Sequence, residues 1–383
     1  MKRIMFCRWL VSLLAAAAVP FASAQTADPV KVGVMLPLTG PAALAGTSIL
    51  EGIRFAADEA NAKGGVNGRQ VQLFIEDDEG SSTKGVTAVR KLIESDKVVA
   101  ISGTYVSAVA LAASKVSKEH KVPMVSAGST ASSVTSANSA GDPWFFRAFP
   151  GTDEQAEQSA RDIVKKLNAK KVVIIRENSI YGSSLTDQMK RMVPSFGGEI
   201  VGVESYNPDE RDFYSVLTRI RARGPDAIYV AGLMDAGVQI IRQSREVGMK
   251  TQIVGSGSMM SDKLIELAGP ASEGFAVSSM FEPSTPNRFG QAFARAFRGK
   301  FKKEPDVYSA LGYDSMHLII EAARRTKKVD GSAIQAALKS MNNVPLTQGP
   351  EGTVAKFDAQ GSVSFKVGLA IVRHGKREWL PFD

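Results

Sequence analysis

The sequence predicts an α/β protein built from two doubly wound lobes. From Val30 onward, short β-branched runs alternate with amphipathic segments of helical period, which is typical of a parallel sheet covered by helices on both faces. The alternation stops at residues 127–150, a polar stretch of Ser, Thr and Ala, and then starts again. Because two separate runs need two separate sheets, and because 383 residues exceed the usual length of one domain, we expect two lobes.

The first run opens with a buried strand at residues 30–36, where apolar side chains are nearly continuous. A helix is predicted over residues 47–63, because its apolar residues fall on one helical face and a glycine pair follows it. The rest of this run is predicted as a strand at 71–76, a helix at 83–95, a strand at 98–102, a helix from Ser107 and a strand at 123–126.

The second run repeats this pattern and leads into a helical block. Predicted helices at 153–167, 181–196, 211–223 and 236–247 alternate with strands at 171–176, 199–204, 227–231 and 252–254. After residues 275–281, helices are predicted at 287–301, 307–327 and 332–341, and strand-like runs at 354–357 and 362–373 close the chain. Terminal strands after a helical block predict that the chain passes between the lobes more than once.

The first residues predict export. Lys2, Arg3 and Arg8 form a basic start, an apolar run follows, and Ala22-Ser23-Ala24 provides a small-x-small cleavage site. We therefore expect residues 1–24 to be a cleaved signal peptide and the mature chain to reside in the periplasm. Cys7 lies inside the signal peptide, so we expect a mature chain that is not lipidated and contains no cysteine.

Composition and motifs argue against several functions. Removal of the signal peptide lowers the formal charge from +8 to +5, and no Lys/Arg run with interleaved aromatic residues predicts a nucleic-acid partner. His120, His317 and His374 lie far apart, which argues against a zinc site. There is no Gly-x-Ser-x-Gly elbow and no P-loop. We expect no catalytic residues, no metal and no cofactor.

Polar loops follow the ends of the predicted strands. Three of them stand out, at residues 38–41, 103–107 and 127–130. Open α/β sheets bind ligands outside the carboxyl ends of their strands, and helix N-termini there offer free N–H groups to an anion. Ser107 and Thr130 are equally compatible with helix capping, and a residue can serve both roles.

At these loops the sequence resembles the periplasmic leucine/isoleucine/valine-binding protein family, the type I receptors of ABC importers. The most specific stretch is Asn61-Ala62-Lys63-Gly64-Gly65-Val66-Asn67-Gly68. The matching stretches occur in the expected order over essentially the whole mature chain: residues 32–41, residues 60–68 with Asp77-Asp78, residues 123–127, Tyr181-Gly182 and Ala231-Gly232.

The resemblance implies two Rossmann-like lobes joined by three crossover strands, which close over a ligand by hinge bending. It places the N-terminal lobe at residues 28–148 plus 282–352, and the C-terminal lobe at 149–281 plus 353–383. It also implies a monomer with a small-molecule carboxylate ligand and, as partners, the membrane permease subunits of an ABC importer.

Several binding residues are implied by the same resemblance. Ser107 and Thr130 match positions whose hydroxyls bind the ligand α-carboxylate, helped by the backbone at Gly128. Tyr181 matches an aromatic residue of the second lobe that closes on the ligand. Tyr105 lies in the pocket loop of the first lobe, and Tyr308 matches an aromatic residue against the ligand side chain; interlobe packing is the other interpretation for Tyr181 and Tyr308.

The sequence departs from the family where a carboxylate of the second lobe pairs with the ligand ammonium. Gly257 stands at the place of that acid, and Leu233 replaces an aromatic residue. An unpaired ammonium in a closed cleft is costly. Asp235 is a possible substitute, although it is also a possible helix cap. Two ligand classes stay open: a hydrophobic or branched-chain amino acid that uses Asp235, and an aromatic or short organic acid without an amine, which we favour.

Three function classes fit these observations to different degrees. A transport binding protein accounts for the signal peptide, the two lobes and the carboxylate loop. A sensory receptor of the same fold, serving a chemotaxis or regulatory partner, is the alternative. An exported hydrolase is a third class, for which the sequence offers no nucleophile–base pair.

Overall fold

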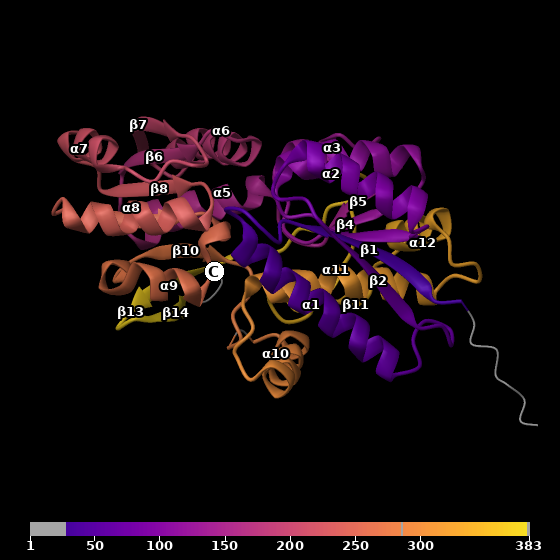
Figure 1. Cartoon of the computed structure of the whole chain (residues 1–383). Coiled ribbons are helices and arrows are strands. Elements are labelled where there is room, and N and C mark those ends of the chain that lie inside the picture. The colour runs from indigo at the N-terminus through magenta and orange to yellow at the C-terminus, as the bar shows by residue number, and fades with distance from the viewer. Residues whose placement is uncertain (1–27, 285, 381–383) are drawn as a thin grey trace, which may run out of the picture.

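The computed structural model describes residues 28–284 and 286–380, and the predicted signal peptide lies outside them. It contains two large sheets, each flanked by helices, in two lobes that lie side by side (Figure 1). The predicted two-lobed α/β fold class is therefore confirmed. Among the described residues, no helix is both long and apolar enough to cross a membrane.

The first lobe is built around a parallel sheet whose order places β1 beside both β2 and β3. Its strands are, in spatial order, β2 (Val71–Asp77), β1 (Val30–Leu36), β3 (Ala100–Gly103), β4 (Met124–Ser126) and β5 (Phe145–Arg147). Val32 and Val34 pack toward α1 (Ala43–Ala62) and α11 (Val307–Arg324), whereas Met35 packs toward α2 (Ser82–Arg90) and α3 (Ser107–Glu119). Alternate residues of β1 thus enter two different cores, as a strand covered on both faces requires.

The second lobe is built around a mixed sheet. Its strands are, in spatial order, β14 (Lys376–Leu380), β13 (Gly368–Arg373), β10 (Ala276–Ser279), β9 (Gln252–Gly255), β8 (Ala227–Ala231), β6 (Lys171–Glu177) and β7 (Glu199–Tyr206). β13 and β14 are antiparallel to their neighbours, and the other strands run parallel. Helices α5 (Thr152–Arg161) and α6 (Ile180–Ser195) cover one face, and α7 (Tyr214–Ala222), α8 (Met234–Glu246) and α9 (Asp262–Ala268) cover the other.

The chain passes between the two sheets three times. It leaves β5 for α5 through residues 148–151, and it leaves β10 for α10 (Arg288–Phe301) through residues 280–287. It returns through residues 356–367, between the short β12 (Val354–Ala355) and β13. Helix α12 (Gly331–Lys339) and strand β11 (Val344–Pro345), which pairs with β12, precede this last crossing. The lobe boundaries given above fall in or near these segments and stay a prediction.

The elements that were not predicted include α4 (Ser132–Ser136), β5, α9, β11 and β14. The missed strand β5 contains Phe145 and Phe146, which are buried on opposite faces of the sheet. Only three residues of this segment pair with β4, and prolines flank it, so its strand character comes from the neighbouring strand rather than from a local pattern.

Two elements begin three or more residues later than predicted. The helix predicted over 211–223 begins at Tyr214, because the Gln243 side chain binds the preceding backbone, accepting from the Phe213 N–H (2.6 Å) and donating to the Arg211 carbonyl (2.8 Å). The strand predicted over 362–373 begins at Gly368, since residues before it turn around the Asp358 carboxylate, which accepts from the Ser362 N–H at 2.9 Å.

Candidate ligand-binding site

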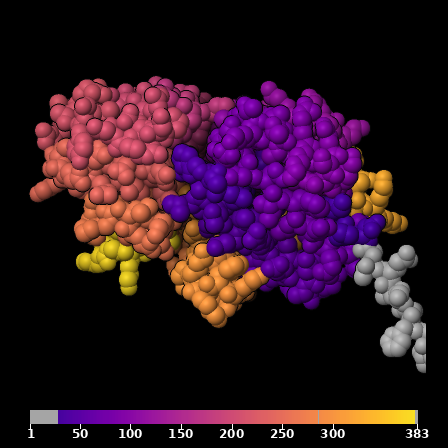
Figure 2. All heavy atoms as spheres, viewed as in Figure 1, coloured from indigo at the N-terminus to yellow at the C-terminus, as the bar shows by residue number. Residues whose placement is uncertain are grey.

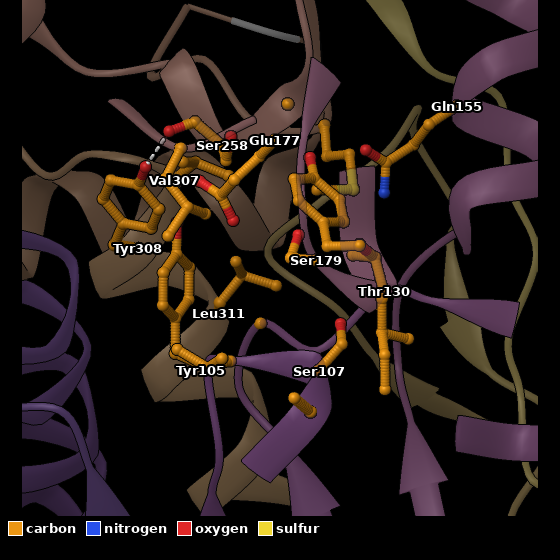
Figure 3. A pocket seen from close by; sticks show the side chains of 18 residues that line it. Tyr105, Ser107, Thr130, Gln155, Glu177, Ser179, Ser258, Val307, Tyr308 and Leu311 are labelled. Atoms are coloured by element: carbon orange, nitrogen blue, oxygen red, sulfur yellow. Dashed lines mark hydrogen bonds between the residues drawn. The ribbon is translucent and has the colours of Figure 1, made fainter. Parts of the chain in front are cut away.

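A cavity lies where strand ends of the two sheets face each other (Figure 3). It holds about 590 Å³ of space not filled by protein atoms, part of it open to solvent. Of the predicted site residues, all but Asp235 line it: Tyr105, Ser107, Gly128, Thr130, Tyr181, Leu233, Gly257 and Tyr308. The structure thus gathers residues of both lobes around one space, and their role in binding a ligand stays a proposal.

The first lobe contributes a polar end to the cavity. Ser107 is the first residue of α3, whose cap position is Val106, and Thr130 precedes Ala131, the cap residue of α4. Neither side chain caps its helix, so the capping interpretation does not describe them. The Ser107 hydroxyl accepts from the Ala131 N–H at 3.3 Å, which joins the two loops. The N-terminus of α3, with its partial positive charge and free N–H groups, borders the cavity beside these hydroxyls.

Buried hydrogen bonds fix the loop that carries Thr130. The Ser126 hydroxyl oxygen accepts from the N–H groups of Ser129 (2.9 Å) and Gly128 (3.3 Å). The loop passes so close to Tyr105 that a Cβ added to Gly128 would lie 2.5 Å from its ring, so only glycine fits there. The Thr130 carbonyl accepts from the Arg147 guanidinium at 2.6 Å.

Three buried tyrosines contact the cavity from different elements. Tyr105 and Tyr308 meet edge to face, with ring centroids 5.7 Å apart, and Tyr181 lies in the first turn of α6. The Tyr308 hydroxyl on α11 donates to the Ser258 carbonyl of the second lobe, as the dashed line in Figure 3 shows. Burial raises the pKa of all three phenols, so they stay neutral at physiological pH.

Apolar side chains form much of the remaining wall. They come from the starts of four helices and from the crossing after β10: Val106, Ile180, Leu233, Met280, Val307 and Leu311. A ligand that fills this space needs an apolar part beside its polar group.

Sequence reasoning missed four polar residues that line the cavity: Gln155, Glu177, Ser179 and Ser258. Glu177 is only 5% exposed, and burial raises the pKa of its carboxyl, whereas hydrogen bonds from the Ser179 hydroxyl and the Leu233 N–H lower it. A signal was available, because Glu177 ends β6 and strand ends face ligands in such sheets. The predicted strand ended one residue too early to include it.

Asp235 and Gly257, the two positions considered above for pairing with a ligand ammonium, differ in whether they line the cavity. Asp235 lies in the first turn of α8, whose cap position is Leu233, so it is not the cap residue, and it does not line the cavity. Gly257 lines the cavity, and a Cβ added there would lie 2.8 Å from the Gln155 side-chain oxygen. The place beside Gly257 is therefore occupied by a neutral amide.

A wider hollow adjoins the cavity and forms its mouth. Residues of both lobes border it, among them Pro41 and Glu79 from the first lobe and Asn178 and Asp187 from the second. Figure 2 shows the two lobes as adjoining masses. Among residues 28–284 and 286–380, no group of three or more His, Cys, Asp and Glu side chains is placed to hold a metal ion.

Comparisons with known proteins agree with this architecture. A family model described as periplasmic binding protein matches residues 29–376. A Leu/Ile/Val-binding protein homolog 2 of Brucella abortus (strain 2308) is 30% identical over 370 residues, which are 95% of this chain and 94% of the relative.

Two of the solved structures similar to this chain have the same fold and are 28% and 26% identical to it in sequence. The leucine binding protein LivK from Thermotoga maritima MSB8 is 28% identical with a TM-score of 0.85, covering 92% of this chain and 98% of its own. The branched-chain amino acid transporter substrate binding protein LivJ from Streptococcus pneumoniae, in complex with isoleucine, is 26% identical with a TM-score of 0.84, covering 91% and 98%.

Proposed function

The chain belongs to the periplasmic binding protein family, and from this premise we propose that it is the solute-binding component of an ABC importer. It takes a small carboxylate ligand from the periplasm into the cavity between its lobes and delivers that ligand to membrane permease subunits. The relatives named above are binding proteins, and the proposed role is likewise non-catalytic.

One observation carries this proposal: two hydroxyls and a helix N-terminus meet at one end of a cavity whose wall is largely apolar. Ser107 and Thr130 offer O–H groups, and the start of α3 offers backbone N–H groups. This arrangement suits a carboxylate, because a carboxylate accepts several hydrogen bonds and is stabilised by the positive end of the helix dipole. Among residues 28–284 and 286–380, no lysine, arginine or histidine lines the cavity, so the proposed anchor is made of neutral donors.

The apolar wall limits the rest of the ligand. Val106, Leu233, Met280 and Leu311 favour an aliphatic or aromatic group over a polar one. Two ligand classes satisfy this wall and the carboxylate anchor, a hydrophobic amino acid and an aromatic or aliphatic acid without an amine.

Thermal unfolding of the mature chain (residues 25–383) tests the proposal. A panel of amino acids and of aromatic and aliphatic acids is added, and positive results are followed by calorimetry. A ligand present at 100 times its Kd stabilises the folded state by about 2.7 kcal/mol, which raises the unfolding temperature measurably. If no carboxylate in the panel raises it, the proposed function is wrong.

A further inference from the structure

Ile180, the first residue of α6, belongs to the second lobe but packs against the first. The buried core cluster that it contacts consists of residues between Met35 and Phe145, all of them in the first lobe. Within the described part of the chain, Ile180 does not pack against the second-lobe core cluster that contains its neighbour Tyr181. The contact of Ile180 therefore joins the two lobes, and it exists only while they are together.

This contact lies at the mouth of the cavity, where α3 and α6 face each other at neighbouring ends of the two lobes (Figure 1). Val106 and Leu111 offer apolar side chains from the first lobe, and together with Ile180 they border the hollow that forms the mouth. The other second-lobe residues at this hollow are mostly polar, among them Arg176, Asn178, Ser183 and Asp187. If the lobes separated, Ile180 would be exposed to water among these groups, which costs free energy.

A second contact between the lobes is polar and lies deeper in the protein. The hydroxyl of Tyr308, a buried residue on α11 of the first lobe, donates to the Ser258 carbonyl of the second lobe. Both this hydrogen bond and the packing of Ile180 are made between protein groups. Each of them therefore favours the closed arrangement whether or not the cavity holds a ligand.

We propose that Ile180 is an apolar latch between the lobes, so that the chain populates its closed arrangement even without a ligand. A ligand then shifts an equilibrium that already includes the closed state. This inference concerns the balance between two arrangements of the lobes. It goes beyond the proposed function, which requires only that a ligand binds between the lobes.

Distance measurements on ligand-free protein test the inference. Residues 25–383 with Glu79→Cys and Asp187→Cys carry spin labels at exposed positions on opposite lobes, and bound solutes are removed by unfolding, dialysis and refolding. The distance distribution is expected to contain a short and a long component. Ile180→Ser is expected to lower the ratio of the short to the long component about 3- to 10-fold, the effect of exposing about one to two methylene-sized groups.

Two further variants separate a latch from a general loss of packing. Ile200→Ser is the matched control, because Ile200 is a half-buried isoleucine of the second lobe that packs against the core of that same lobe. It is expected to lower the unfolding temperature and to leave the distance ratio unchanged. Ile180→Val keeps a branched apolar side chain at the latch, so it should keep most of the short component.

The inference is wrong if the labelled protein without further substitution shows only the long component when no ligand is present. It is equally wrong if Ile180→Ser, shown to be folded by circular dichroism, keeps the original ratio, or if Ile200→Ser lowers the ratio as much as Ile180→Ser does. Because no ligand is added, none of these results decides the proposed function, which the thermal unfolding panel tests separately.

Discussion

The hydroxyls of Ser107 and Thr130 reach one end of the cavity because β3 and β4 are neighbours in a parallel sheet. Both strands end at the same edge, so the loops that follow them lie side by side. The hydrogen bond from the Ala131 N–H to the Ser107 hydroxyl oxygen, at 3.3 Å, then holds these two loops together.

Substitution Ser107→Ala is expected to weaken the binding of a carboxylate ligand by about 1–3 kcal/mol. It removes a donor to a charged acceptor and leaves that acceptor partly unsatisfied in a buried site. Calorimetry measures the effect, with Ser114→Ala, a half-buried serine in the middle of the same helix, as the control. An unchanged Kd for Ser107→Ala would mean that the anion site lies elsewhere.

Sequence reasoning identified the first-lobe residues better than the second-lobe residues. Ser107, Gly128 and Thr130 lie in polar loops directly after predicted strands, so a local rule finds them. Gln155 lies inside a helix, and nothing in its local sequence distinguishes it from a solvent-exposed residue of that helix. Its position beside Gly257 arises only when α5 packs next to β10, which the sequence pattern does not encode locally.

At the level of elements, Arg147, which precedes the first crossing segment, links the loop that carries Thr130 to the third crossing segment. It ends β5 and is 4% exposed. Its guanidinium donates to the carbonyls of Thr130 (2.6 Å) and Ala131 (3.3 Å) and to the Ser362 hydroxyl (3.1 Å) in the third crossing. A single side chain thus positions the Thr130 loop relative to the connections between the lobes.

Substitution Arg147→Met is expected to lower the free energy of unfolding by about 2–3 kcal/mol, because it removes several buried hydrogen bonds. Ligand affinity should fall as well, since the loop that carries Thr130 loses the hydrogen bonds that the Arg147 guanidinium donates to it. Urea unfolding and calorimetry measure the two effects. Arg295→Met, at an exposed position of α10, should change stability by no more than about 0.5 kcal/mol. Equal stability of the two variants would contradict the linking role of Arg147.

Helix α11 is joined to the chain after β11 by a buried carboxylate. Asp314 accepts from the Thr347 N–H (3.0 Å) and hydroxyl (2.9 Å) and from the Gln348 side-chain amide (3.0 Å). Burial nevertheless raises the pKa of Asp314 from 3.8 to about 7, against the lowering effect of these hydrogen bonds. The folded state therefore binds a proton that the unfolded state releases between these two values.

This difference predicts how stability depends on pH. Because the folded pKa is raised, the contribution of Asp314 is fully present below pH 4 and is lost as the pH rises toward 7. Relative to Asp314→Asn, which has no charge to titrate, the wild-type protein should lose free energy of unfolding between pH 4 and pH 8. Urea unfolding across this range measures the difference in free energy of unfolding between the two proteins. A difference that does not change with pH would show that the Asp314 carboxyl has the same pKa in the folded and unfolded states.

On the scale of the whole molecule, the alternation of strands and helices predicted two sheets, and the order of elements predicted repeated passage between them. The short β5 and the contacts across the cavity were not predictable, because they depend on how segments far apart in sequence pack. The bond from the Tyr308 hydroxyl to the Ser258 carbonyl joins the two lobes across the cavity, as expected of a closed arrangement.

Ligand binding is expected to favour this closed arrangement, because a ligand held by both lobes binds the closed state more tightly than the open one. Residues 25–383 contain no cysteine, so labels can be attached at chosen sites in this part of the chain. The pair Glu79→Cys and Asp187→Cys places spin labels at exposed positions on opposite lobes at the mouth of the cavity. A saturating ligand should shift the distance distribution of this pair to shorter values. The pair Glu79→Cys and Glu119→Cys, within the first lobe, should not respond. If calorimetry shows binding while the distance across the mouth stays the same, the ligand does not act by closing the lobes.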